Sequence, residues 1–531
     1  MANKNRSSPS SATPKLMEVS GFSLMNEDLL RNILSRLPAI SFASAATVSK
    51  TWNAACCHIL SRPKLSSAIS LKPLPLVALQ EVFDKVMSEP IRPHFAIASV
   101  GPGFEIKDVL QFMVEKVRSR TPIIVSSVKG ILGRDALSHE FREVKWIDGN
   151  IDEVPVNTGI VLTVGFVPGL KVDVIPLLRQ RKAPQGSMID KFVQDIKSYT
   201  SSMSGCTSPQ AIIMIGDGSV DQKPILEKLD YAMSMETIIV GDERGQFVYR
   251  SSDVSRNVGT NKKHSPDAVA LVFARDRNKA RGIGNIEFHF ALSKGVSAIG
   301  PRLKAASVRV QDSYTVTWLT ARREGQQEIL DGQQMLEDID NEMENNMDCV
   351  DLYIGVTRRR NCSVGSDKPK MMTTLALHGV EGGDSEYLYV DGVGIRTGDY
   401  FQFYHSDPKT ALSSSRNVSS TLRKLKLDWD SKSSLSKSTI INAVDKKEAF
   451  GGFIFSCLGR GESFFGQLNV DSSPFLDNFP RVPVAGTFCG GEIGRGCTSL
   501  TANGDEGGSA RCHLHVYSTV YLVMLYTPPE H

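Results

Sequence analysis

A short amphipathic stretch near the N-terminus, residues 24–57, constrains the fold of this chain most tightly. Leu29, Ile33 and Leu37 recur at four-residue steps and predict one apolar stripe along a helix. A proline ends that helix, and a second apolar run leads to Trp52. Because a segment this small cannot bury both faces of its helices alone, we expect part of its apolar surface to bind a partner.

The same stretch resembles the F-box, a short helical module that docks onto the Skp adaptor of cullin-based ubiquitin ligases. The matching features, in chain order, are Leu24, Glu27-Asp28-Leu29-Leu30, Ile33, Leu37, Val48-Ser49-Lys50 and Trp52. The resemblance implies that the adaptor is bound by Leu24, Leu29, Ile33, Leu37, Val48 and Trp52. The residues also leave open an ordinary helical hairpin.

The start of this module departs from the family pattern. F-boxes usually open with Leu-Pro, whereas Leu24 here is followed by Met25-Asn26. Proline in a first helical turn presets the backbone, and asparagine can cap a helix in its place. We therefore expect the first helix to form, with Asn26 as its cap, and we expect the missing proline to affect adaptor affinity.

Composition is that of a soluble globular protein with two to four domains. The chain has 531 residues, of which 41% are hydrophobic and 22% are charged. The net charge of +3 gives no electrostatic argument for nucleic-acid binding, and no apolar run reaches the length of a membrane-spanning helix. We therefore expect neither a nucleic-acid partner nor a membrane partner.

The N-terminal residues and the cysteines indicate an intracellular location. Residues 1–20 are polar and lack the apolar core of a signal peptide, so a disordered tail is expected there. The nine cysteines are scattered and odd in number, which favours reduced thiols in the cytoplasm or nucleus.

Beyond the N-terminal module, apolar strands alternate with amphipathic helices. Residues 95–101 and 121–130 predict two strands joined by a helix over 105–118, which indicates an α/β layered domain. Later strands have few helices between them, so part of the sheet is expected to be antiparallel. The predicted fold class is α/β with mixed α+β sheets, in which a small helical module precedes a two-part α/β body.

Two later segments carry weaker patterns. Residues 330–347 are acidic and sparsely apolar, which predicts a surface helix near a domain junction. Residues 407–438 are rich in serine and predict a mobile loop with a helical insert over 421–429. A leucine-rich-repeat consensus occurs once, from Leu422 to Leu427. Since stacked repeats need about three copies or more, an amphipathic helical turn is favoured there.

Two glycine-rich motifs in the last hundred residues could hold a ligand. In the first, residues 451–466, a strand ends at Cys457 and the chain enters Gly459-Arg460-Gly461. The glycines allow a ligand to approach the backbone closely, and the Arg460 guanidinium suits a carboxylate or phosphate. The motif fails as a dinucleotide fingerprint, because its third glycine is misplaced and no adequate helix follows.

The second motif, residues 483–497, places glycines on both sides of a single carboxylate, Glu492. A tight backbone around one glutamate can hold an amine or another hydrogen-bond donor. A plain glycine-rich turn with this carboxylate at the surface is the alternative. The candidate ligand-binding residues are Cys457, Arg460, Gly461, Gly491 and Glu492.

Cysteine and histidine residues near the C-terminus form no recognisable metal motif. Five of them lie close together in the sequence: Cys489, Cys497, Cys512, His513 and His515. Zinc stays open as an alternative, but the spacing is not C-x-x-C and there is no second pair of ligands, so we predict no metal and no cofactor. A catalytic thiol would need a low pKa beside a base, and Cys457 is the best candidate, although a plain core cysteine is favoured.

The body of the chain, from about residue 93 to 526, resembles the FIST family, a domain with an N-terminal and a C-terminal half. The C-terminal match rests on residues 455–461, 465–466, 469, 483–486 and 491–494. The N-terminal match rests on the first strand and helix of the body and on the turn Ser126–Gly130. The two resemblances together imply an F-box over 21–68, a FIST N-terminal domain over 93–328 and a FIST C-terminal domain over 329–527.

This combination implies a function in protein ubiquitination. An F-box in front of a FIST body implies a non-catalytic substrate receptor, with a Skp-type adaptor, a cullin and an unknown protein target as partners. The FIST resemblance also implies a sensory domain that binds a small, amino-acid-like ligand. A ligand sensor is therefore the first alternative, and a thiol or cofactor enzyme is the second.

Overall fold

The computed structural model describes nine stretches of the chain. They are residues 26–117, 120–146, 158–179, 184–257, 265–310, 316–344, 350–434, 447–496 and 511–529, with the backbone alone for 265 and 428–434. The chain divides into two compact units, Met1–Leu60 with Ser88–Pro90 and Ser61–Met87 with Ile91–His531. The predicted tail over 1–20 lies outside the described residues.

The first unit holds three short helices around a small apolar core. They are α1 (Glu27–Leu34), α2 (Ala39–Ala45) and α3 (Lys50–Ile59). Asn26 caps α1 as predicted, since its side chain accepts a hydrogen bond from the Asp28 amide at 3.2 Å. Ser49 caps α3 by accepting from the Trp52 amide, also at 3.2 Å. The core consists of Leu30, Leu34, Phe42, Ala45, Ala55 and Cys56.

The second unit contains a ten-stranded sheet. Its main path runs β1 (Lys64–Ser70), β6 (Ile160–Phe166), β2 (Phe95–Val100), β3 (Ile123–Ser127), β9 (Ile238–Arg250), β8 (Ala211–Asp217), β10 (Ser265–Arg275) and β7 (Leu170–Arg179). Two short strands, β20 (Glu492–Arg495) and β21 (Leu514–His515), join it at β9. As predicted, β2 and β3 are parallel and α5 (Ile106–Val117) connects them, while many other pairs are antiparallel.

A six-stranded sheet in the same unit mixes early and late parts of the chain. Its order is β11 (Asn285–Ser293), β22 (Thr519–Thr527), β18 (Glu448–Cys457), β19 (Val484–Cys489), β4 (Gly130–Arg134) and β5 (Phe141–Lys145). Only β18 and β19 are parallel among these described pairs. The two predicted halves, 93–328 and 329–527, therefore contribute strands to the same sheets.

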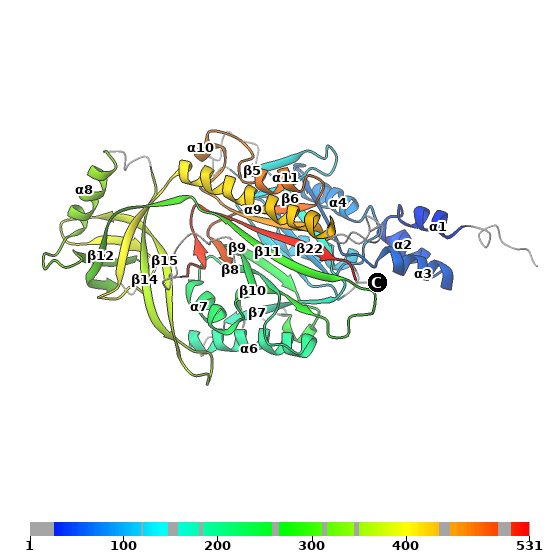
Figure 1. Ribbon diagram of the computed structural model, residues 1–531, viewed down its shortest axis with the longest axis horizontal. Coiled ribbons are helices and arrows are strands. Elements are labelled where there is room, and N and C mark those ends of the chain that lie inside the picture. Colours follow the sequence, from blue (N-terminus) through cyan, green and yellow to red (C-terminus); the bar gives the residue numbers. More distant parts are fainter. Residues whose placement is uncertain are drawn as a thin grey trace, which may run out of the picture. The chain divides into compact units, whose positions relative to one another are not determined.

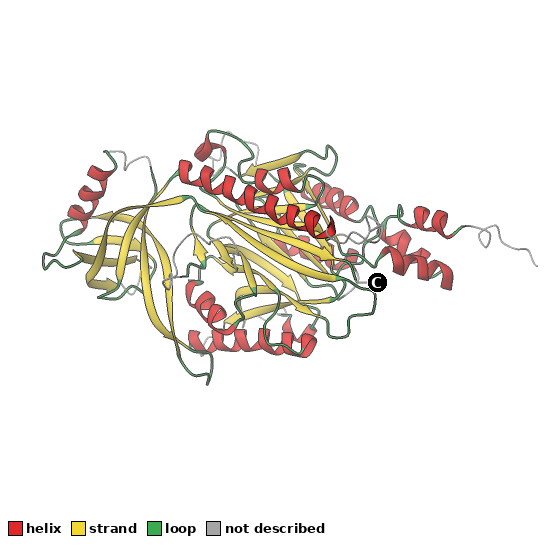
Figure 2. Ribbon diagram, in the orientation of Figure 1, coloured by secondary structure: helices red, strands yellow, loops and turns green. Residues whose placement is uncertain are grey.

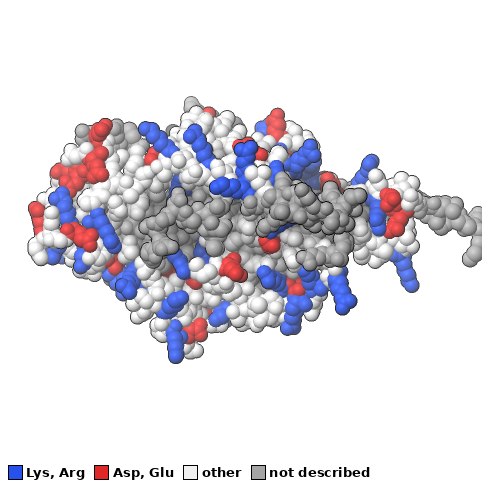
Figure 3. Space-filling view, in the orientation of Figure 1, with Lys and Arg blue, Asp and Glu red and all other residues white. Residues whose placement is uncertain are grey.

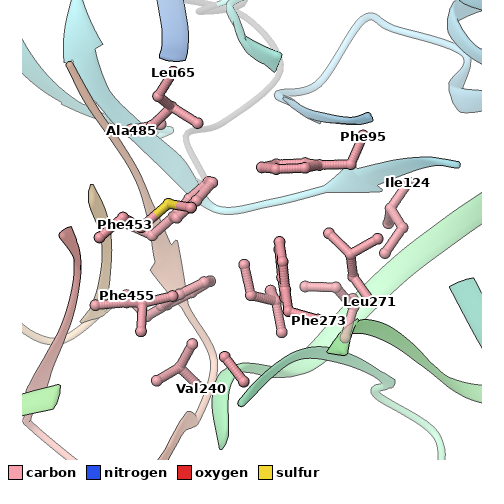
Figure 4. Close-up of a cluster of buried hydrophobic side chains, with 14 of the residues drawn as sticks. Leu65, Phe95, Ile124, Val240, Leu271, Phe273, Phe453, Phe455 and Ala485 are labelled. Carbon is pink, nitrogen blue, oxygen red and sulfur yellow. The ribbon is translucent and has the colours of Figure 1, made fainter. Parts of the chain in front are cut away.

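The two sheets pack face to face, with helices on their outer faces (Figures 1 and 2). Figure 4 shows the core between them, where Phe95, Ile124 and Phe273 of one sheet meet Phe453 and Phe455 of the other. Four helices cover the ten-stranded sheet: α4 (Pro75–Val86), α5, α6 (Gln185–Ser204) and α7 (Lys223–Ala232). The six-stranded sheet is covered by α9 (Pro408–Ser434) and α11 (Ser473–Asn478).

The remaining strands close into a barrel. In order around it they are β12 (Val296–Val310), β13 (Val316–Arg323), β16 (Leu388–Asp391), β15 (Lys370–Gly383), β14 (Leu352–Cys362) and β17 (Tyr400–Ser406). The helix α8 (Gly332–Glu342) packs on the barrel and buries Met335 and Ile339, so the predicted surface helix is present with one buried side. Two further short helical turns are Val254–Arg256 and α10 (Glu462–Phe465).

The mixed α and β fold class is confirmed, and one predicted element is wrong. Residues 408–434 of the serine-rich segment predicted as a mobile loop form the 27-residue helix α9, because Ala411, Val418 and Leu422 lie on one buried side of it. The helical insert predicted over 421–429 lies within α9, and residues 435–438 lie outside the described residues. None of the described helices is long and apolar enough to cross a bilayer.

Candidate functional site

The first unit leaves apolar side chains exposed next to its core. Leu30 and Leu34 fill the core, and the neighbouring positions Leu29 and Ile33 face outward, 55% and 41% exposed. Val48, in the turn before α3, is 64% exposed. An unpaired apolar surface on so small a unit is the property expected of a docking face.

The six predicted adaptor-binding residues do not all have the same environment. Leu29, Ile33 and Val48 are exposed, whereas Leu37 and Trp52 are half-buried against the core of the unit. The sixth residue, Leu24, lies outside the described residues. We call Leu29, Ile33 and Val48 the F-box face. The binding role of all six stays a prediction.

The predicted ligand residues gather where the six-stranded sheet ends and β20 begins. Cys457 ends β18 and stands in register with Cys489, which ends the parallel strand β19. Two glycines then lead into Glu492 at the start of β20, which pairs with β9 of the other sheet. The glycines permit this passage from one sheet to the next, because a Cβ on Gly491 would lie 2.5 Å from Glu243 Oε2.

Arg460 belongs to a buried ion pair. Its side chain is fully buried, its Nε donates to Asp471 Oδ1 at 2.9 Å, and its Nη2 lies 2.7 Å from the same oxygen. The other donors reach the Tyr517 carbonyl at 2.9 Å and Ser293 Oγ at 3.1 Å. The Arg460 guanidinium, predicted to bind a ligand, is thus bound by groups of the protein itself. Gly461, which follows it, has a φ of 106° and lets the chain turn there.

Glu492 makes fewer hydrogen bonds with the protein than Arg460 does. It is fully buried and lies opposite Asp242 of β9. Its Oε2 accepts from the Ser518 amide at 3.2 Å, the Cys457 thiol lies next to the carboxyl group, and Oε1 has no partner with hydrogen-bond geometry among the described residues. The alternative of an exposed carboxylate in a glycine-rich turn is therefore wrong, because the pairing of β20 with β9 buries the side chain.

Burial disfavours the charged forms of the acids and thiols in this region. It raises the pKa of Glu492 well above its usual value and the pKa of Asp242 to about 7. Burial, together with the Glu492 carboxyl, also raises the pKa of the Cys457 thiol well above its usual range. At neutral pH this region can exchange hydrogen bonds with a ligand, but it offers no thiolate, which a cysteine nucleophile needs.

The cysteines and histidines predicted to form no metal motif are held by separate contacts. The Cys512 thiol contacts the Leu514 carbonyl at 3.1 Å, His515 Nε2 lies 3.0 Å from the Gly494 carbonyl, and His513 Nε2 lies 3.2 Å from Asp230. Cys497 lies outside the described residues. Over the described ranges, no three His, Cys, Asp or Glu residues are placed to share a metal ion.

Sequence reasoning missed the carboxylates that organise this region. Asp471 forms the ion pair with Arg460, and Asp242 lies opposite Glu492. Neither aspartate belongs to a recognisable sequence motif. A third, Asp230 of α7, collects Arg495, Arg511 and His513. Each contact joins residues far apart in the chain, so spacing carries no signal for it. The only available sign was an acidic pair, Asp242 and Glu243, inside an apolar strand.

Comparisons with known proteins support both resemblances in part. Residues 22–62 match the family model of the F-box domain, and residues 380–495 match that of the FIST C domain. An F-box/LRR-repeat protein of Arabidopsis thaliana is 45% identical over 509 residues, which is 95% of this chain and 93% of the relative. The F-box and the FIST C domain are thereby confirmed, and the FIST N-terminal domain stays a prediction.

The leucine-rich-repeat term in the relative's name has no counterpart in the described part of this chain. The single consensus match lies on α9, where Leu422 is buried and Leu427 is 56% exposed. This is the amphipathic helical turn that the sequence favours. Mixed sheets and a barrel stand where stacked repeat units would be expected.

Proposed function

The chain belongs to the F-box protein family, and from that premise we propose that it is the substrate-recognition subunit of a Skp–cullin–F-box ubiquitin ligase. The observation that carries the proposal is the F-box face, Leu29, Ile33 and Val48, exposed on a unit that already has its own core. This face would bind a Skp-type adaptor and, through it, a cullin. The ligase would act in the cytoplasm or nucleus.

The proposed mechanism is proximity and involves no bond chemistry on this chain. The second unit would hold the protein target while the first unit is bound to the adaptor. Tethering in this way raises the effective concentration of target lysines near the loaded conjugating enzyme. The neutral Cys457 and Glu492 fit a non-catalytic role, because neither is in the ionised form that a nucleophile or general base needs.

The substitutions Leu29→Asp and Val48→Asp together should weaken adaptor binding by at least about 100-fold, since central apolar anchors each contribute roughly 2 kcal/mol or more. Both positions tolerate aspartate in the fold: Leu29 lies in the first turn of α1, where a negative charge is favourable, and Val48 lies in a turn. Titration of the purified full chain with a purified Skp-type adaptor measures the effect.

A matched control places the same change on the second unit. Leu74 and Leu76 are exposed at the start of α4, and Leu74→Asp with Leu76→Asp should leave adaptor affinity unchanged. Unchanged binding by the Leu29 and Val48 variant, or equal loss in both variants, would argue against the F-box face as the adaptor site.

A second candidate function is a small-ligand sensor, favoured by the unpartnered Oε1 of the buried Glu492. A buried polar atom without a partner is costly, and a ligand donor could satisfy it. In a thermal-shift screen of amino acids and related metabolites, a ligand at about 100 times its Kd should stabilise the protein by about 2.7 kcal/mol. Glu492→Ala, which removes both oxygens, should abolish the shift, and Glu462→Ala, at an exposed position, should keep it; a screen without any shift would remove this candidate.

A further inference from the structure

The helix α9 carries a row of cations on its outer side. Ala411, Val418 and Leu422 face the six-stranded sheet, so the positions on the opposite side of the helix face outward. From residue 408 to 427 every charged residue of α9 is basic. The exposed ones form no ion pair among the described residues. We call them the α9 cations: Lys409, Arg416, Arg423 and Lys424.

The helix α8 has the opposite charge. One side of it packs on the barrel, and every charged residue within the helix is acidic. Two of these acids are bound by the barrel: Asp338 pairs with Arg323 at 2.6 Å, and Glu342 Oε1 accepts from the Gly300 amide at 3.1 Å. Three others follow the outer side at helical spacing, the last just beyond the helix end. We call them the α8 acids: Glu337, Asp340 and Glu344.

The two helices of the second unit adjoin on the strand β12. The end of α8 reaches this strand through the bond of Glu342 to Gly300, and Thr410 Oγ1, in the first turn of α9, lies 2.6 Å from Ser297 Oγ. The two contact points on β12 are only about 10 Å apart along the strand. Figure 3 shows acidic side chains over α8 and basic side chains over α9 on the same face. An acidic zone therefore borders a basic zone on one surface.

We propose that this surface binds a second copy of the chain, related by a two-fold axis, so that the α8 acids of each copy face the α9 cations of the other. In a two-fold interface the same patch occurs on both copies and has to complement itself. A patch with an acidic zone beside a basic zone does so when the axis passes between the zones. Arg416 lies about 9 Å beyond Thr410 along α9, which leaves room for the axis.

Other anionic partners fit this surface less well. A lipid bilayer holds an amphipathic helix by its apolar side chains, and those of α9 are buried against the sheet. A nucleic acid or a uniformly acidic peptide that follows α9 toward the barrel meets the α8 acids, which repel it. Residues 409–427 also include no aromatic ring on which a base could stack. The partner that fits has both charges in the reversed order, and the chain itself has them.

The size of the surface sets the expected strength of pairing. The α9 cations span about 22 Å of helix, and α8 is about 16 Å long. Two helix faces of this length per copy belong to the class of interfaces below about 1,200 Å², which are weak or transient. We therefore expect a dimer that depends on low salt. In a ligase, the pair would bring two F-boxes together, and this consequence rests on the proposed function.

Sedimentation velocity of the full chain tests the proposal, and it is measured without adaptor so that the result does not depend on the F-box face. Wild type at about 100 µM should sediment as a dimer in about 50 mM salt and as a monomer in about 500 mM salt. The variant R416E/R423E/K424E should pair about tenfold or more weakly, because each substitution acts twice in a two-fold interface.

The matched control reverses three exposed cations on the helices that cover the other sheet, K107E/K116E/K191E on α5 and α6. Each substitution lowers the charge by two units, so both triple variants go from a net charge of +3 to −3 and keep the same general repulsion between copies. The control should pair like wild type, and both variants should melt within a few degrees of it.

Charge exchange separates pairing of the two zones from general effects. A fluorescently labelled E337K/D340K/E344K protein should be monomeric alone and should form heterodimers with R416E/R423E/K424E, because the reversed zones complement each other. Mixed with K107E/K116E/K191E, which has the same net charge, it should form far fewer. A wild type that stays monomeric at about 100 µM in low salt, equal weakening by the control, or no heterodimer in the first mixture would overturn the proposal.

Discussion

Replacing Asp471 by alanine is expected to lower the free energy of unfolding by about 3–5 kcal/mol. Arg460 and Asp471 are both fully buried, and the carboxylate also accepts from Ser456 Oγ at 3.0 Å and Thr519 Oγ1 at 2.8 Å. Removing it leaves a guanidinium charge in the interior of the second unit without its counter-ion. Since whole domains are stable by only about 5–15 kcal/mol, the loss should be plain in denaturant titration.

Two further variants separate the ion pair from general damage. The double variant Arg460→Met with Asp471→Leu should be more stable than Asp471→Ala, because no unpaired charge stays buried. In the exposed pair of Arg142 and Glu140, Glu140→Ala should cost at most about 1 kcal/mol. If Asp471→Ala and Glu140→Ala have similar stability, Arg460 is not held by the contacts described.

Replacing Asp230 by asparagine should cost about 3 kcal/mol at neutral pH. Its Oδ1 accepts from Arg495 Nε at 2.8 Å, and its Oδ2 lies 3.1 Å from Arg511 Nη1 and 3.2 Å from His513 Nε2. The carboxylate thereby ties α7 to β20 and to the residues before β21. Arg495 also donates to the Ser234 and Thr237 carbonyls at 2.8 and 2.7 Å, and these hydrogen bonds stay in the variant. The expected loss of unfolding free energy is therefore at the lower end of the range for breaking a buried ion pair.

The same carboxylate predicts how stability depends on pH. Burial alone would raise the pKa of Asp230, but His513 and Arg495 hold it well below its usual value. A carboxyl with a lowered native pKa contributes fully above its unfolded pKa of about 3.9 and loses that contribution as the pH falls further. The stability difference between wild type and Asp230→Asn should thus shrink as the pH falls below about 4. A difference that stays undiminished down to about pH 2 would contradict this reading.

The sequence indicates local elements well and long-range contacts poorly. The unit of β2, α5 and β3 follows from apolar runs and one amphipathic period, and the helix cap at Asn26 follows from a side chain next to its own helix. The helix α9 was mistaken for a loop because serine is more frequent in turns than in helices. Burial of Val418 and Leu422 against the second sheet overrides that preference.

In the candidate ligand site, too, local features could be predicted and long-range contacts could not. The glycines and Glu492 could be located from their spacing, since a strand must end and another begin there. The position of Arg460 could not, because its partner Asp471 is identified only when β18 and α11 are packed together. An arginine between two glycines looks available in the sequence, and it is buried and paired in the fold.

The F-box face and the second unit are expected to bind different partners. Affinity purification from cells, with the proteasome and cullin neddylation inhibited, tests it by comparing wild type with the Leu29→Asp and Val48→Asp variant. The variant should lose the Skp-type adaptor and the cullin but keep the proteins bound by the second unit. Retention of the adaptor by the variant, or loss of every partner together, would contradict it.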